Sequence, residues 1–213
     1  MSSEWLIETR CAPPFYKNGY LLACAETRQA VMIDPGDEVE ELASVADSRE
    51  WEIQAILLTH AHIDHITGVG FAKERYPVPI YLHQDDLFLY EGLPQQGKKF
   101  GVRLDAPPTV DRYYQHGDIV RWGKLSAEVV HTPGHTPGGI CLKVGDLLVA
   151  GDTLFAGSIG RTDLPGGDYA TLIRSIQTRL LVLPDETAVY SGHGPATTIG
   201  EERRSNPFLQ ELL

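Results

Sequence analysis

Short apolar runs alternate with amphipathic stretches along the chain, and this pattern predicts an α/β fold. In the first half the runs are rich in Leu, Ile, Val and aromatic residues, as in half-buried or buried strands. The stretch that follows the Asp-Pro-Gly-Asp turn at 34–37 has its apolar residues on one helical face. We therefore expect strands at residues 5–9, 20–25, 30–33, 53–59 and 80–82, and helices at 39–48 and 69–75.

The second half repeats this style. We expect strands at 119–122, 126–131, 139–144, 146–150 and 187–191, a helix at 169–181 and a short helix after residue 198. Between the halves, residues 92–112 show no clear period and many breakers, which predicts a long loop, either a functional lid or a disordered segment. Its apolar Phe100 and Leu104 favour a loop that packs on the fold. Two halves of this kind predict two sheets packed face to face with helices outside.

The bulk properties narrow the class of protein. The chain has 213 residues, which suits a single domain over 1–213. Its net charge of −11 argues against a nucleic-acid or anionic-membrane partner, because no basic field would attract one. The three cysteines are far apart, and no basic stretch followed by an apolar one opens the chain. We therefore expect a cytoplasmic protein without a disulfide framework, a monomer or a small homo-oligomer.

The densest chemical signal is the hexapeptide His-Ala-His-Ile-Asp-His at 60–65, directly after the predicted strand 53–59. Neutral imidazoles and carboxylates are the ligands that transition metals prefer. In an extended loop His60 and His62 point to one side. Asp64 and His65 then stand where the chain turns into a helix, and they can face a second centre. The hexapeptide therefore predicts a metal site.

Three later segments share this context, a polar loop after an apolar strand. His135 lies between two Pro-Gly pairs, Asp152 ends a buried strand, and His193 lies between two glycines. Each is a weak signal alone, since strand-ending aspartates and glycine-flanked histidines are common in ordinary turns.

Together, these segments resemble the metal-binding signature of the metallo-β-lactamase superfamily. The resemblance rests on Thr-His-Ala-His-Ile-Asp-His at 59–65, Thr-Pro-Gly-His-Thr at 132–136, Gly-Asp152 and Gly-His193-Gly. The segments 160–163 (Gly-Arg-Thr-Asp) and 206–209 (Asn-Pro-Phe-Leu) resemble its short glyoxalase II-like hydrolases. The likeness implies an α/β fold, a four-layer αββα sandwich of two mixed sheets with helices outside.

The resemblance also implies the ligand set and the chemistry. His60, His62 and His135 would bind one metal, Asp64, His65 and His193 the second, and Asp152 would bridge them. The cofactors would be two divalent ions, zinc first, with iron or manganese as alternatives. A metal-bridging hydroxide would attack the carbonyl of a small acyl thioester such as S-lactoylglutathione. Asp64 and Asp152 are the carboxylates that the catalytic centre would use.

Several more polar residues have two interpretations each. Arg161 could bind a substrate carboxylate or could pair with Asp163 or Asp168. Asp34 could hydrogen-bond a ligand histidine or could be a turn residue. We expect His131 to be structural or an outer neighbour of the site, since the family's ligand is the second histidine of its motif, and His83 and His116 to be ordinary surface or turn residues.

The chain departs from the family pattern in two ways, and several alternative functions stay open. Longer glyoxalase II enzymes carry a C-terminal helical domain that holds glutathione, and we expect none here; many relatives also have His where Gly139 stands. A mononuclear iron persulfide dioxygenase would use only His60, His135 and Asp152, leaving His65 and His193 without a metal. The same ligands could also serve a lactone, ester or β-lactam hydrolase, or a non-catalytic metal-binding module.

Overall fold

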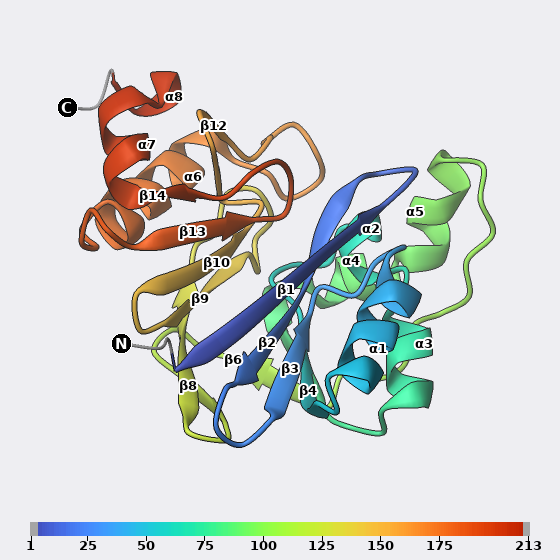
Figure 1. Cartoon of the computed structure of the whole chain (residues 1–213). Coiled ribbons are helices and arrows are strands. Elements are labelled where there is room, and N and C mark those ends of the chain that lie inside the picture. The colour runs from blue at the N-terminus through green and yellow to red at the C-terminus, as the bar shows by residue number, and fades with distance from the viewer. Residues whose placement is uncertain (1–3, 211–213) are drawn as a thin grey trace. The chain divides into compact units, whose positions relative to one another are not determined.

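The computed structural model describes residues 4–210, which form two compact units (Figure 1). Unit 1 runs to Tyr114 and includes Val120–Ser126, while unit 2 comprises Gln115–Ile119 and the chain from Ala127 on. The division falls within β7 (Ile119–Trp122) and near the start of β8 (Leu125–His131). Within residues 4–210, no helix combines the length and apolar character that crossing a bilayer requires.

Unit 1 is a mixed sheet with helices. Its strands follow the order β1 (Trp5–Ala12), β2 (Lys17–Cys24), β3 (Gln29–Ile33), β4 (Glu52–Leu57), β5 (Ile80–His83) and β6 (Arg112–Tyr114). The first three pair antiparallel, and β3 to β6 pair parallel. Its helices are α1 (Val39–Ser48), α2 (Ile63–Ile66), α3 (Val69–Arg75), η1 (Gln84–Asp86), α4 (Leu87–Glu91) and α5 (Leu93–Lys99).

The core of unit 1 lies between its sheet and its helices. Leu42 of α1 and Val69 of α3 pack with Leu21, Met32 and Ile56 of the strands, and all are buried. The neighbouring positions Leu22, Ile33 and Leu57 are also fully buried, so β2 to β4 are apolar on both faces. Such two-sided burial explains why these strands appear in the sequence as continuous apolar runs.

Unit 2 also contains a mixed sheet. Its strands follow the order β14 (Thr197–Thr198), β13 (Ala188–Ser191), β10 (Leu147–Gly151), β9 (Ile140–Val144) and β8. In this order β10 and β13 pair parallel, and the other neighbours pair antiparallel. A separate hairpin joins β11 (Leu154–Phe155) to β12 (Ser158–Ile159). The helices are α6 (Tyr169–Ser175), the π-helical turn η2 (Ile176–Leu180), α7 (Ile199–Ser205) and α8 (Pro207–Gln210).

Most predicted elements are present, and two mixed sheets with helices confirm the predicted α/β class. The helices at 39–48 and 69–75 have the expected bounds. The predicted long loop at 92–112 is wrong in its first third, where α5 begins with Pro94 in its first turn, a position that suits proline. The predicted helix at 169–181 divides, because α6 passes into the π-helical turn at Ile176.

Candidate metal centre

The histidine loop of unit 1 connects β4 to α2. His62 is the N-cap of α2 with extended backbone angles, and Asp64 and His65 occupy its single turn. The ring centroids of His60 and His62 are 4.9 Å apart, and those of His60 and His65 are 4.0 Å apart. All three histidines are buried, His65 completely. The local fold therefore brings the predicted ligands of this loop close together.

Two of these imidazoles have a defined tautomer. His65 Nδ1 lies 2.9 Å from Asp34 Oδ2, and because a carboxylate only accepts, Nδ1 must carry the proton. The Thr59 hydroxyl donates to the same oxygen at 2.6 Å, so its own oxygen is available to accept from His60 Nδ1, which is 3.2 Å away. In both rings Nε2 is then the nitrogen with a lone pair. Fixing Nδ1 in this way is how proteins orient metal-binding histidines.

Asp34 is the centre of this arrangement. Its side chain also accepts from the Thr59 backbone N–H at 2.7 Å, and it is buried. Its backbone, directly after β3, has φ of 49°, in the left-handed region that aspartate tolerates better than most residues. Of the two interpretations of Asp34, the structure shows the hydrogen bond with a predicted ligand histidine, in which His65 Nδ1 donates to the carboxylate.

Two further residues that the sequence did not indicate hold the loop. The buried Asp86 accepts from the Ala61 N–H at 3.0 Å. Gln96 of α5 accepts from the Ile63 N–H and donates to the Ala61 carbonyl, each at 3.0 Å. No short-range signal could have found them, because Gln96 lies in the segment expected to be a loop and Asp86 lies 25 residues from its partner.

The remaining three predicted ligands lie in unit 2. His135 Nε2 is 3.6 Å from Asp152 Oδ2, and His193 Nε2 is 3.7 Å from the same oxygen. His135 Nδ1 lies 2.8 Å from the Arg161 carbonyl, which only accepts, so Nε2 again has the lone pair. Asp152 thus stands between two imidazole nitrogens, which is the arrangement that a shared metal-binding carboxylate requires.

Two glycines allow the loops of unit 2 to lie directly against α6 and against the segment that carries Asp152. A Cβ on Gly134 would lie 2.2 Å from the backbone nitrogen of Leu172 in α6, and its φ of 132° is unfavourable for other residues. A Cβ on Gly160 would lie 2.0 Å from the Asp152 carbonyl and 3.1 Å from His135 Nδ1. Close packing therefore requires glycine at positions 134 and 160.

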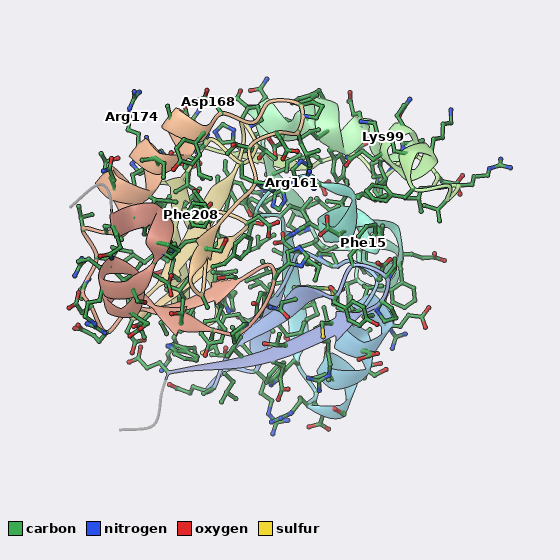
Figure 2. The ribbon with its side chains drawn as sticks, turned by 90° about the horizontal axis from the view of Figure 1, so that it is seen from above. Phe15, Lys99, Arg161, Asp168, Arg174 and Phe208 are labelled. Atoms are coloured by element: carbon green, nitrogen blue, oxygen red, sulfur yellow. The ribbon has the colours of Figure 1, made fainter. Side chains whose placement is uncertain are left out.

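Arg161 is engaged with a neighbour. Its Nε and Nη2 donate to the two oxygens of Asp163, each at 2.7 Å, and both side chains are more than half exposed. The guanidinium lowers the pKa of Asp163 to about 2. Asp168 instead accepts from the Thr171 N–H and caps α6. Figure 2 shows Arg161 and Asp168 in their loops.

The remaining histidines have structural contacts. His131 Nε2 lies 2.9 Å from the Pro137 carbonyl, to which it donates. His116 Nδ1 accepts from the His131 N–H at 3.4 Å, and His83 Nδ1 accepts from the Asp85 N–H at 3.3 Å. The contact of His131 is of the structural kind expected for it, while His83, expected to be a surface or turn residue, ends β5.

The two groups of ligands fit metal ions. In unit 1 His65 Nε2 is 3.7 Å from Asp64 Oδ2, and in unit 2 the corresponding separations are 3.6 and 3.7 Å. These distances are too long for hydrogen bonds. Ligand atoms each about 2.1 Å from one ion lie roughly 3–4 Å apart in tetrahedral or five-coordinate geometry. The donor chemistry, the fixed tautomers and the spacing therefore suit ligands of divalent transition metals.

Comparison with known proteins agrees with this chemistry. The sequence pattern of the Metallo-beta-lactamase superfamily matches residues 12–193. A Haemophilus influenzae protein named hydroxyacylglutathione hydrolase GloC is 43% identical over 188 residues, covering 86% of this chain and 89% of that protein.

Two solved structures are also similar. BLEG-1, described as a B3 metallo-beta-lactamase, has a TM-score of 0.90 at 36% identity and covers 96% of this chain and 100% of that chain. TTHA1623, described in a di-iron-bound form, has a TM-score of 0.86 at 42% identity, covering 95% of this chain and 100% of that chain. These matches confirm the predicted fold class.

Proposed function

Because the chain belongs to the Metallo-beta-lactamase superfamily, we propose that it is a dinuclear metal-dependent hydrolase that cleaves an acyl thioester such as S-lactoylglutathione. The observation that carries the proposal is the repeated geometry of its ligands. In both units an imidazole Nε2 lies 3.6–3.7 Å from a carboxylate oxygen, while a protein acceptor holds the Nδ1 proton of His65 and of His135. Seven ligands of this kind suffice for two ions.

The ligand assignment follows the family signature. His60, His62 and His135 would hold one ion, and Asp64, His65 and His193 the second. Asp152 would be shared, which agrees with its place between two imidazoles of unit 2. When bound, two such ions would lower the pKa of a shared water to about 7 and polarise the thioester carbonyl.

The chain's own residues would prepare this centre and orient the substrate. Asp34 and the Arg161 carbonyl hold His65 and His135 with Nε2 available. The Arg161 guanidinium would bind a substrate carboxylate after exchanging its partner Asp163, an exposed pair of the kind that contributes at most about 1 kcal/mol. One residue would thus hold the proposed ligand His135 through its backbone carbonyl and bind the substrate through its side chain.

The choice of thioester over other acyl compounds rests on the relative that is named a hydroxyacylglutathione hydrolase. The choice of metal is open between zinc and iron, because histidine and carboxylate ligands accept both and a similar protein has been described with two irons. A small-molecule substrate agrees with the absence of a basic field in a chain of net charge −11.

A thiol-release assay tests the proposal. The metal-loaded protein is expected to hydrolyse S-lactoylglutathione with kcat/KM of at least about 10⁴ M⁻¹s⁻¹, the lower end for working enzymes. Asp118→Asn, which changes an exposed turn aspartate of unit 2, should leave this rate unchanged. Oxygen uptake with glutathione persulfide, and no thiol released from the thioester, would instead identify an iron dioxygenase and overturn the proposal.

A further inference from the structure

The chain segment after α5 turns back along that helix and leaves a groove. The Val102 N–H donates to the Gly97 carbonyl at 3.0 Å, and Gly97 itself faces the segment. A Cβ on Gly97 would lie 2.8 Å from the Val102 carbonyl and 3.1 Å from Leu104 Cδ1. The glycine therefore lets the returning segment lie directly against the helix, in a position fixed by packing and a hydrogen bond.

Two cavities share this segment. One of about 650 Å³ is lined mainly by Pro94, Lys98, Val102, Arg103, Leu104 and Ala106. The second, of about 260 Å³, shares Arg103, Leu104 and Ala106 with it and extends to Ile66 and Thr67. We call the two cavities together the α5 groove. The larger volume lies in the range typical of small-molecule sites.

The groove has apolar walls and a cationic edge. Lys98, Lys99 and Arg103 are exposed, and none forms any of the ion pairs found among residues 4–210, whereas Lys73 and Lys124 elsewhere in unit 1 are paired with acids. Asp105 also lines both cavities and offsets one of the two lining cations. In a chain of net charge −11, these unpaired cations give a local positive charge that suits an organic anion.

An aromatic side chain adds apolar surface beside the cationic edge. Phe100 follows Lys99 in the chain, is 59% exposed, and contacts Phe15 of the β1–β2 turn edge-on with ring centroids 5.2 Å apart. Figure 2 labels Lys99 and Phe15 in this region of unit 1. Apolar walls with a few charged groups at the margin suit a ligand with a partly aliphatic, peptide-like body and terminal carboxylates.

The groove is connected to the histidine loop. Gln96 of α5 bonds to both Ala61 and Ile63, so the helix that forms one wall also fixes the metal-binding segment. The smaller cavity reaches Ile66 and Thr67, directly after His65. A molecule lying in the groove would therefore have one end beside the ligand-bearing helix α2.

We propose that the α5 groove binds the thiol-side portion of the substrate, a peptide-like chain with carboxylates, and so selects anionic acyl thioesters. The inference rests on the proposed thioester hydrolysis. Lys98 and Arg103 receive the carboxylates, and Leu104 and Ala106 contact the aliphatic body. The groove thereby takes the part that a separate glutathione-binding domain has in the longer glyoxalase II enzymes that the chain resembles.

Kinetics with two thioesters that carry the same acyl group test the charge recognition. In the double variant Lys98→Gln/Arg103→Gln, KM for S-lactoylglutathione should rise roughly threefold to tenfold with kcat unchanged, because two exposed charge contacts are lost. KM for the uncharged lactoyl thioester of N-acetylcysteamine should not change. Arg121→Gln, an exposed arginine outside the groove, is the matched control and should leave both values unchanged. An unchanged KM for the anionic thioester in the double variant, or an equal rise for both thioesters, overturns the proposal.

Direct binding separates this inference from the proposed function. Calorimetric titration of the metal-loaded protein with S-methylglutathione, which cannot be hydrolysed as a thioester, should show at least threefold weaker binding in the double variant. It should also show at least tenfold weaker binding in Ala106→Trp, whose exposed position lets the new ring fill the groove. Normal affinity in Ala106→Trp would place the ligand elsewhere and overturn the inference.

The two sets of results are distinguishable. Binding that both variants weaken, with no hydrolysis by the wild type, refutes the proposed function and supports the groove. Hydrolysis by the wild type, with binding unaffected by either variant, refutes the groove and leaves the proposed function intact. Neither hydrolysis nor binding by the wild type overturns both.

Discussion

Replacement of Asp34 by asparagine should damage metal binding without removing any metal ligand. Asp34 accepts from the Thr59 N–H, the Thr59 hydroxyl and His65 Nδ1, at 2.7, 2.6 and 2.9 Å. Asparagine has one acceptor oxygen, which can retain the bond from the Thr59 N–H. Its amide group would then face His65 Nδ1 and donate to it, which moves the imidazole proton to Nε2, the nitrogen that should bind the metal.

The structure sets the size of the effect. The charge-assisted bonds from the Thr59 hydroxyl and from His65 Nδ1 are lost, each of a kind that contributes about 1.5–3 kcal/mol, and a neutral amide–imidazole bond of about 1 kcal/mol replaces one of them. The metal-free protein should therefore lose roughly 2–5 kcal/mol of unfolding free energy. Loss of an outer partner of a metal-binding histidine typically lowers metal affinity about 10–100-fold. This corresponds to about 1.4–2.8 kcal/mol of binding free energy.

Two measurements separate these effects. Urea unfolding of the metal-free protein gives the stability change, and competition with a chromophoric chelator, at a temperature where both proteins are folded, gives the affinity. Thr59→Val leaves the contact between His65 and Asp34 but removes the hydroxyl that holds His60 Nδ1, so it should lower stability and should lower affinity less than Asp34→Asn does. Asp37→Asn, an exposed aspartate three residues away that accepts from Thr67 at 3.1 Å, should change neither. A folded Asp34→Asn protein with affinity within twofold of wild type would refute the tautomer argument.

Three further predictions concern the second group of ligands and the core of unit 1. Asp152→Ala should reduce hydrolysis to a few per cent or less and lower the metal content, measured together by thiol release and elemental analysis; substantial residual activity would contradict a shared carboxylate. Arg161→Ala should raise KM for an acidic thioester more than it lowers kcat, whereas Asp163→Ala, which releases the guanidinium from its ion pair, should lower KM. Steady-state kinetics in which neither variant changes KM would show that the ion pair has only a structural role. Glu38→Ala leaves the buried Lys17 ammonium without its 2.6 Å partner and should cost about 3–5 kcal/mol in urea unfolding, and Lys17→Met/Glu38→Leu should recover much of that loss.

The sequence predicted most of the fold because its strongest patterns were long and local. The apolar runs of β2 to β4 and the amphipathic period of α1 can be recognised in the sequence, because each reflects which residues are buried. Helix α5 was missed because Gly92, Pro94 and Gly97 oppose a helical prediction. The structure shows why Gly97 stands there, since a Cβ would meet the returning chain. Such a requirement depends on contacts that a local pattern does not contain.

Some residues of the candidate site could likewise be predicted from local sequence and others could not. The residues of the histidine loop were predictable because six consecutive positions carry the signal, and Asp34 could be proposed from the end of its strand. Asp86 and Gln96 could not, because they bond to backbone groups 25 and 35 residues away. Arg161 had two interpretations, and the structure shows its ion pair with Asp163.

The most direct test of the central claim is metal stoichiometry on protein purified without chelator. Elemental analysis should find two divalent ions per chain, zinc, iron or a mixture. Titration of metal into the chelator-treated protein should restore thioester hydrolysis fully only at two equivalents. One iron per chain, with oxygen consumption on a persulfide and no thioester hydrolysis at any metal loading, would contradict the dinuclear hydrolase.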